Sequence, residues 1–268
     1  MILTIPFYTP ENKRRHKELV SVLKSNIQKK FIKKIILLID DDTFKDQNLI
    51  SPKITIVRLG GIGCPLSQYL VSSGLKHLTL FDGDRIERTN LGRQILYSLD
   101  DIGEYKSICA KNRLLKTNPY CKITTYSENL TEKNINVLLD ADIIIDTSDD
   151  WQLSKLINKF CVKNSLQYIF SSAINNNIQI CLFKNQINHT CLNCVFPNDE
   201  DVELARCDTV GISSICAGIA GLITAQKTIN TILKINDENN ILSLINSENL
   251  SISNIKIKNN ADCTLNNG

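Results

Sequence analysis

The chain has 268 residues, of which 43% are hydrophobic, 22% charged and 6% aromatic. This is the composition of a folded globular protein, large enough for one α/β domain with an appendage or for two smaller domains, and it excludes collagen-like and low-complexity chains. The formal net charge of +3 has no block of basic residues behind it, so we expect no nucleic-acid partner.

The cysteine content and the apolar pattern bear on location. Ten cysteines would suit a disulfide scaffold in a short secreted chain, but this chain is long, and the apolar run at residues 1–7 is too short for a signal sequence. No uncharged stretch of about 18 apolar residues is present to span a bilayer. We therefore expect a cytoplasmic protein with reduced thiols and no membrane partner.

Residues 1–48 are expected to form a strand–helix–strand appendage. An amphipathic stretch with apolar residues at helical spacing lies there between two apolar runs. The pattern has a faint similarity to the start of nucleotide-sugar glycosyltransferases, but a second metal-binding motif is missing, and the role of the appendage stays open. Residues 47–52 are expected to be a linker.

From residue 53 to residue 268 the chain alternates buried strands with helices, which predicts a second domain with a doubly wound sheet. The predicted fold class is α/β, with a mostly parallel Rossmann-like sheet, an antiparallel C-terminal half and the short βαβ-like appendage. The expected strands are residues 54–57, 77–82, 122–126, 143–146, 168–172 and 252–258. The expected helices are one ending near residue 73 and those at residues 106–116, 151–163 and about 212–233.

A glycine-rich turn follows the first strand of this domain. Gly60, Gly61 and Gly63 stand between that strand and a helix, where backbone N–H groups can approach a phosphate at the helix N-terminus. The alternative is a turn used only for close packing of the strand against the helix. Arg58 occupies the first glycine position of G-x-G-x-x-G, which predicts a strained backbone or a different turn.

Asp82 and Asp84 follow the next strand, where a carboxylate can accept hydrogen bonds from ribose hydroxyls. The glycine turn, this strand and three later polar runs form an ordered set of motifs: residues 60–70, 78–84, 89–94, 100–106 and 146–149. From residue 53 onward the chain resembles the ThiF/MoeB/HesA family of ubiquitin-activating-enzyme-like adenylyltransferases. The run Thr-Asn-Leu-Gly-Arg-Gln at residues 89–94 is the most distinctive of these motifs.

The resemblance implies MgATP-dependent adenylation of the C-terminal glycine carboxylate of a ubiquitin-like sulfur-carrier protein, or of a peptide with a Gly-Gly or similar tail, by a homodimer. The pathway stays open among thiamine, molybdopterin, cysteine and peptide-antibiotic biosynthesis. Because the carboxylate attacks a phosphate, the site must neutralise charge. The resemblance assigns phosphate contacts to Arg93, Lys106 and Asn90, ribose binding to Asp84, and Mg²⁺ binding to Asp149. Taken singly, each could be a solvated surface residue.

Cys191 and Cys194 form a CxxC pair, which is half of a tetrahedral zinc site, a redox pair or a chance occurrence. In the family that the chain resembles, a second CxxC near the C-terminus completes a structural zinc site. Cys263 is present at the matching position, but Asn266 stands where the fourth cysteine is expected. Three thiolates with water or His189 would bind Zn²⁺ less tightly, and metal-free thiols are the alternative.

Cys207 lies four residues before Gly211, at the position where sulfur-transferring members of the family carry a cysteine. Close to the start of a helix its thiolate would be stabilised, which favours a nucleophilic role in sulfur transfer. The alternative is an ordinary buried cysteine. Core packing is expected for five further cysteines: Cys109, Cys121, Cys161, Cys181 and Cys216.

Three departures from the family pattern favour a second interpretation. They are Arg58, Asn266 and the absence from residues 1–48 of the family's N-terminal arginine motif. The chain could then be a catalytically silent module that binds a nucleotide or a ubiquitin-like tail. An NAD-linked oxidoreductase is disfavoured, because the run at residues 90–94 has no role in hydride transfer. We favour the adenylyltransferase, since the implied phosphate, ribose and magnesium ligands are all retained.

Overall fold

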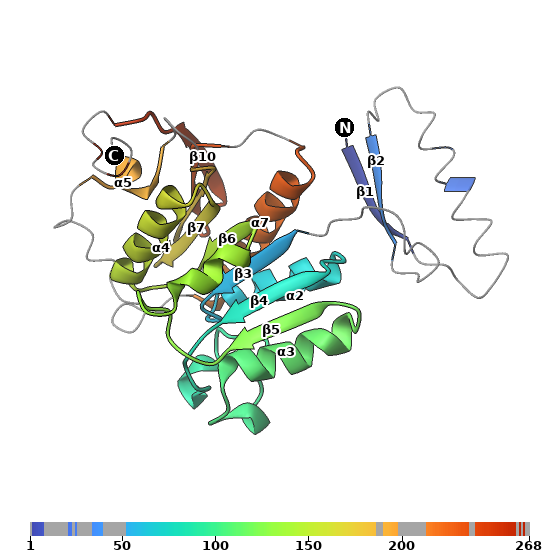
Figure 1. Cartoon of the computed structure of the whole chain (residues 1–268). Coiled ribbons are helices and arrows are strands. Elements are labelled where there is room, and N and C mark those ends of the chain that lie inside the picture. The colour runs from blue at the N-terminus through green and yellow to red at the C-terminus, as the bar shows by residue number, and fades with distance from the viewer. Residues whose placement is uncertain are drawn as a thin grey trace. The chain divides into compact units, whose positions relative to one another are not determined.

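The computed structural model describes residues 2–7, 21–22, 25, 34–39, 52–185, 190–197, 213–235, 239–260, 263 and 265. The chain divides into two compact units, Met1–Ser51 and Pro52–Gly268 (Figure 1). In the first unit, β1 (Ile2–Phe7) and β2 (Lys34–Ile39) pair in parallel. Parallel neighbours require a crossover connection between them. Residues 21, 22 and 25 of that connection are helical, and the rest of the predicted helix lies outside the described residues.

The second unit contains an eight-stranded sheet. Its strands are β3 (Lys53–Val57), β4 (His77–Phe81), β5 (Lys122–Tyr126), β6 (Ile143–Asp146), β7 (Gln167–Ile174), β8 (Asn177–Phe183), β9 (Ile241–Asn246) and β10 (Ser251–Lys256). They lie in the order β10-β9-β8-β7-β6-β3-β4-β5. Strands β3 to β7 run parallel, and β8, β9 and β10 are antiparallel to their neighbours. The predicted fold class is confirmed.

The helices are α2 (Gly63–Ser72), α3 (Lys106–Thr117), α4 (Trp151–Lys163), α5 (Leu192–Val195) and α7 (Ser214–Ile232). Three short 3-10 helices are η2 (Arg88–Asn90), η3 (Leu99–Asp101) and η4 (Ile135–Asp140). Helix α2 packs against both α3 and α7, so these three cover one face of the sheet (Figure 1). The connection from β6 to β7 runs along the sheet in the direction opposite to that from β3 to β4. A right-handed crossover therefore places α4 on the other face.

The order of the strands creates a switch point. From β3 the chain moves to β4 and β5 on one side, and then returns to β6 and β7 on the other side. The strands that flank this point are buried, with Ile56 and Ile145 fully inaccessible. Their apolar runs fit a parallel sheet covered on both faces. Loops after β3 and β6 therefore meet at one edge of the sheet.

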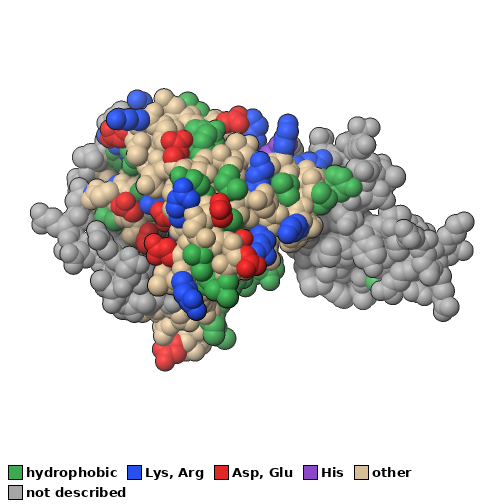
Figure 2. Space-filling model, turned by 90° about the horizontal axis from the view of Figure 1, so that it is seen from below, with side chains coloured by type: hydrophobic (Ala, Val, Ile, Leu, Met, Phe, Trp, Pro, Cys, Tyr) green, Lys and Arg blue, Asp and Glu red, His purple; other side chains and the backbone are tan. Residues whose placement is uncertain are grey.

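The buried core includes the cysteines for which packing was expected: Cys109, Cys121, Cys161, Cys181 and Cys216. Helix α7 and strand β10 begin and end within a few residues of the predicted positions, whereas β7 extends to Ile174 rather than ending at Ser172. Within the described residues, no helix has the length and apolar character needed to cross a membrane. Acidic and basic side chains are interspersed over the face of the second unit that Figure 2 shows.

Candidate functional site

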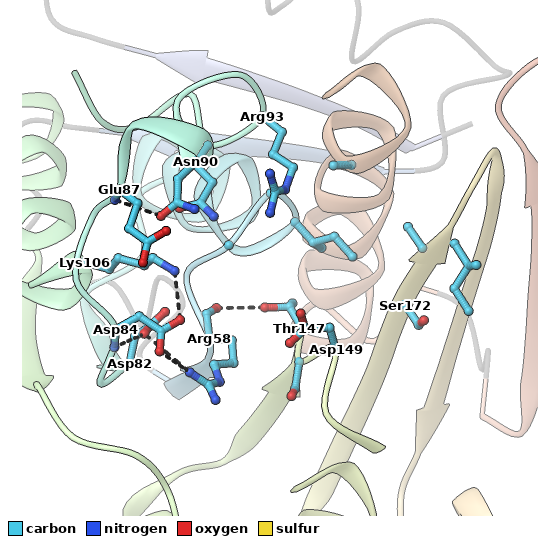
Figure 3. A pocket seen from close by; sticks show the side chains of 18 of the residues that line it. Arg58, Asp82, Asp84, Glu87, Asn90, Arg93, Lys106, Thr147, Asp149 and Ser172 are labelled. Carbon is cyan, nitrogen blue, oxygen red and sulfur yellow. Dashed lines mark hydrogen bonds and ion pairs between the residues drawn. The ribbon is translucent and has the colours of Figure 1, made fainter. Parts of the chain in front are cut away.

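A cavity of about 340 Å³ lies at the carboxyl ends of the parallel strands, beside the switch point between β3 and β6 (Figure 3). This is where open α/β sheets bind their ligands. The cavity lining brings together most of the residues singled out from the sequence: Gly60, Gly61, Asp82, Asp84, Asn90, Arg93, Lys106 and Asp149. Residues far apart in the chain therefore share one small volume.

The glycine turn serves both the cavity and the packing behind it. Gly60 and Gly61 line the cavity, and a Cβ at Gly61 would lie 3.0 Å from the Cβ of Ala217 in α7. Gly63 is not among the lining residues. A Cβ there would overlap the carbonyl oxygen of Arg58, so Gly63 allows α2 to begin directly against the end of β3. The packing interpretation of the turn thus applies at Gly63.

Arg58 adopts a left-handed backbone conformation with φ of 74°. This conformation costs a non-glycine residue roughly 1–3 kcal/mol, so the surrounding structure must hold it. The Arg58 N–H donates to the carbonyl oxygen of Phe81 at 2.8 Å, and the Thr147 hydroxyl donates to the Arg58 carbonyl oxygen at 2.8 Å. These bonds join the glycine turn to β4 on one side and to the loop after β6 on the other.

Asp82 shapes the turn from inside. One carboxylate oxygen accepts a hydrogen bond from the Leu59 N–H at 2.6 Å, and the other accepts from the Asp84 N–H at 2.8 Å. Burial raises the pKa of Asp82, while the nearby charge of Lys106 and these hydrogen bonds oppose the rise. Because its oxygens accept hydrogen bonds from backbone groups on both sides, Asp82 fixes the position of the neighbouring Asp84, and Asp82 itself lines the cavity.

Asp84 has a half-exposed side chain and bridges two cations. Arg58 Nη1 lies 2.9 Å from Asp84 Oδ1, and Lys106 Nζ lies 2.9 Å from Asp84 Oδ2 (Figure 3). Partial burial acts against ionisation of Asp84, but the hydrogen bonds and charges of Lys106 and Arg58 outweigh it and lower the pKa of that carboxyl. Asp84 therefore carries a negative charge at neutral pH and faces the cavity.

Lys106, Asn90 and Arg93 line the cavity together with Asp84. Lys106 is the first residue of α3, and its side chain is only 7% exposed, so its ammonium group is held at the cavity surface. Asn90 ends η2, and its Oδ1 accepts from the Glu87 N–H at 3.1 Å, which leaves Nδ2 as the group it can offer to a ligand. Figure 3 shows the Arg93 guanidinium pointing into the same space.

The loop after β6 carries an exposed acidic residue, Asp149, close to residues that are held in place by hydrogen bonds. Asp146 is fully buried and accepts hydrogen bonds from the Tyr168 hydroxyl at 3.0 Å and from the Ser148 N–H at 2.8 Å. Burial raises the pKa of Asp146 to about 6. The next acid, Asp149, is exposed and lines the cavity, and Asp150 caps the N-terminus of α4. Asp149 is thus a free carboxylate between two anchored neighbours.

A separate cluster of thiols lies around α5. Cys191 Sγ is 4.0 Å from Cys194 Sγ and 3.6 Å from Cys263 Sγ, and Asn259 Oδ1 is 3.7 Å from Cys194 Sγ. Burial and the two neighbouring thiols raise the pKa of Cys191 to about 12. Three sulfur atoms within 4.8 Å of one another are a donor set that fits a borderline-soft cation such as Zn²⁺.

Three residues with predicted roles fall outside the described part of the chain: Cys207, His189 and Asn266.

Asn158 fixes the loop that carries the cluster. Its Oδ1 accepts from the Leu192 N–H at 3.0 Å, and its Nδ2 donates to Asn193 at 3.0 Å. Cys191 and Cys194 therefore lie on a segment that is held against α4.

The family model of the ThiF family matches residues 34–265. The chain belongs to the ThiF family. An adenylyltransferase and sulfurtransferase MOCS3 of Drosophila grimshawi is 30% identical over 230 residues, which cover 85% of this chain and 50% of that protein. A sulfur carrier protein adenylyltransferase of Thermus thermophilus is 28% identical over 195 residues, which cover 70% of this chain and 72% of that protein.

Among solved structures, that of E. coli MccB with ATP superposes with a TM-score of 0.73 at 26% identity, covering 82% of this chain and 68% of the other. The ThiF-family chain spans about half the length of the MOCS3 proteins that it matches. The family predicted from the motifs is confirmed, and so is the fold.

Several lining residues of this ThiF-family chain were not assigned roles from the sequence. Gln94 is 3% exposed, and its Oε1 has no hydrogen-bond partner among the described residues, although it lies in the distinctive run at residues 89–94. Ser172, Ala173 and Ala217 line the far side of the cavity. The signal for Ser172 was its place at the carboxyl end of a parallel strand, whereas nothing local pointed to Ala217.

Proposed function

We propose that this chain is an ATP-dependent adenylyltransferase that activates the C-terminal carboxylate of a ubiquitin-like carrier protein or of a peptide. The observation that carries the proposal is the convergence of Asn90, Arg93 and Lys106 with two carboxylates, those of Asp84 and Asp149, in the lining of one cavity. The ThiF family and the adenylyltransferases among its relatives support it.

The proposed reaction joins two anions. A carboxylate oxygen of the acyl partner attacks the α-phosphorus of ATP, the bond to the β-phosphate oxygen breaks, and pyrophosphate leaves. No protein nucleophile is required, so the site acts by positioning and by neutralising charge. Arg93 offers a planar pair of donors to phosphate oxygens, and Lys106 offers a compact charge. Asn90 orients a phosphate through Nδ2, and Asp84 accepts from the ribose hydroxyls.

Magnesium fits the exposed carboxylate of Asp149, because hard oxygen ligands suit Mg²⁺ and the ion commonly binds through one carboxylate together with substrate phosphates. When bound, the ion would neutralise phosphate charge. Gly60 and Gly61 offer the backbone of the turn to the phosphates. The extended tail of the acyl partner would enter past Ser172 and Ala217, on the side of the cavity away from Lys106.

The remaining parts of the proposal concern structure and sulfur chemistry. Cys191, Cys194 and Cys263 would hold a structural Zn²⁺, and their ligand atoms lie within 4.8 Å of one another. A homodimer is supported by exposed apolar residues of α7, such as Ile215 and Leu222. Sulfur transfer through Cys207 rests on its position in the sequence. A cytoplasmic location is proposed from the sequence, because the chain is far longer than the small secreted domains that depend on disulfides.

The test is carrier-dependent exchange of pyrophosphate into ATP by the purified chain. Asp149→Ala should abolish the exchange while thermal unfolding stays as in the wild type, because Asp149 is exposed and its neighbours hold the loop. Glu132→Ala removes an equally exposed acid away from the cavity and serves as the matched control. Unchanged exchange in Asp149→Ala would remove the magnesium role from this residue.

A second candidate is a module that binds nucleotide without turnover. The observation in its favour is the Arg58–Asp84 ion pair, which adds a cation where the family motif has glycine. Binding of ATP measured by calorimetry, with no exchange in the presence of any carrier or peptide partner, would select this alternative.

A further inference from the structure

On the basis of the nucleotide binding proposed above, we propose that Arg58 is a positioning residue that holds Asp84 for the ribose and thereby sets the preference of the site for ribonucleotides over deoxyribonucleotides. Arg58 stands at the position where the glycine motif calls for its first glycine, so this role belongs to this chain's own residues. The proposal rests on the backbone of Arg58, on its partner and on the space left beside the pair.

The backbone of Arg58 is held in a conformation that a glycine would adopt more easily. Its φ of 74° persists because Phe81 and Thr147 bond its N–H and carbonyl groups from neighbouring strands. Strained residues of this kind persist where the surrounding structure over-determines them, and they are concentrated at functional sites. The strained backbone directs the side chain across the end of β4 to Asp84, where it is only 21% exposed.

The partner, Asp84, has one cation on each oxygen. Arg58 binds Oδ1 and Lys106 binds Oδ2. In the proposed reaction Lys106 is the residue that must serve phosphate, and it would then give up at least part of its contact with Asp84. Arg58 has no phosphate role in the proposed reaction, and its guanidinium lies 2.9 Å from Asp84 against 3.9 Å from Asp82, so it keeps the Asp84 carboxylate ionised and oriented. An ionised carboxylate accepts hydrogen bonds from hydroxyl groups more strongly than a neutral one does.

Space for the sugar remains beside this pair. Asp84 keeps 46% of its side chain exposed, and the cavity of about 340 Å³ adjoins it. Figure 3 shows the Arg58 guanidinium joined to the Asp84 carboxylate, with the Arg58 carbonyl bonded to Thr147. Arg58 and Asp84 both line the cavity, so the ion pair forms part of its wall.

A nucleotide without a ribose hydroxyl would leave the Asp84 carboxylate with an unused acceptor. Loss of a hydrogen bond to a charged group lowers affinity on the order of tenfold or more. One of the two analogues, 2′-deoxyATP or 3′-deoxyATP, lacks the hydroxyl that donates a hydrogen bond to Asp84. We expect the wild-type chain to bind ATP at least about tenfold more tightly than that analogue. The preference depends on Arg58 because Arg58 fixes the direction of that acceptor.

The experiment is calorimetry of ATP, 2′-deoxyATP and 3′-deoxyATP on the full chain and on its Arg58→Gly and Arg58→Lys variants. Arg58→Gly should bring the affinity ratio of ATP to the deoxy analogue close to one, mainly by weakening ATP. Its melting temperature should not fall, because glycine accepts the left-handed backbone. Arg58→Lys, with one compact donor group in place of the planar fork, should restore part of the ratio.

Arg85→Ala is the matched control. Arg85 also lines the cavity, but its guanidinium donates to the Gly103 carbonyl and lies over the Tyr105 ring, so this variant should leave the ratio as in the wild type. An unchanged ratio in both Arg58 variants would overturn the role of Arg58 while leaving the proposed function standing. A wild-type chain that fails to bind ATP would overturn both.

Discussion

Helix α7 approaches the glycine turn so closely that one of its glycines has no room for a side chain. A Cβ at Gly221 would lie 2.6 Å from the Ile62 carbonyl oxygen, 2.6 Å from Pro65 Cγ and 3.0 Å from the Leu66 nitrogen. Gly218, one turn earlier in the same helix, has no atom within 4 Å of its own hypothetical Cβ. Alanine substitutions at these two glycines therefore distinguish the effect of helix propensity on stability from the effect of packing.

Alanine at either position gains about 1 kcal/mol of helix propensity over glycine. At Gly218 nothing opposes this gain, so Gly218→Ala should raise the free energy of unfolding by about 1 kcal/mol. At Gly221 overpacking against the start of α2 costs about 1–3 kcal/mol, which offsets or exceeds the gain in propensity. Gly221→Ala should therefore leave the free energy of unfolding unchanged or lower it by up to about 2 kcal/mol. For a domain of this size the two melting temperatures should differ by roughly 2–12 °C.

The assay is thermal unfolding followed by circular dichroism, together with ATP affinity by calorimetry. Because Ile62 lines the cavity, a shift of the turn in Gly221→Ala should also weaken ATP, whereas Gly218→Ala should bind as the wild type does. Equal melting temperatures in the two variants would refute the close approach of α7. Full ATP affinity in a destabilised Gly221→Ala would refute the coupling between α7 and the glycine turn.

Two further predictions concern buried polar groups. Because burial raises the pKa of Asp146 to about 6, above its ordinary value of 3.8, the folded state binds this proton more tightly than the unfolded state. Its contribution to stability is present at low pH and is lost as pH rises from about 4 to about 6, by up to about 3 kcal/mol. In denaturant titrations at a series of pH values, Asp146→Asn should flatten this part of the plot of unfolding free energy against pH. A plot like that of the wild type would contradict the raised pKa of Asp146. Asn158→Ala leaves the Leu192 N–H unbonded and should lower the free energy of unfolding by about 1–3 kcal/mol. It should also make the proposed Zn²⁺ easier to remove with a chelator. Unchanged unfolding and metal release would argue that Asn158 does not support the thiol loop.

The elements around the cavity were predictable because local patterns report burial. A short β-branched run before a glycine turn predicted β3, and the alternation with buried strands predicted α3 and α4. The convergence of Asp84 and Asp149 was also predictable, since the carboxyl ends of parallel strands meet at one edge of a sheet. These predictions needed only residue type, order and the rules of parallel sheets.

Other features depend on backbone geometry that the sequence does not display. Asp82 was singled out as an acceptor for the ribose, and the sequence did not reveal that both of its oxygens also accept hydrogen bonds from backbone N–H groups. Asn90 uses its Oδ1 to cap η2, which residue type alone does not reveal. Cys191 and Cys263 are separated by 72 residues, and their contact follows from the return of the chain after β10. Only the family resemblance anticipated that contact.

Strand β10 forms the last strand of the described sheet, and all of its residues are exposed. Ile252 is 62% exposed and Ile255 is 47% exposed. An outer strand presents backbone groups that can recruit strands from other chains, and exposed isoleucines add to this tendency. The serines and the terminal lysine of β10 oppose it. Replacing that Lys256 by an apolar residue should therefore promote aggregation during expression, independently of any effect on the distant cavity.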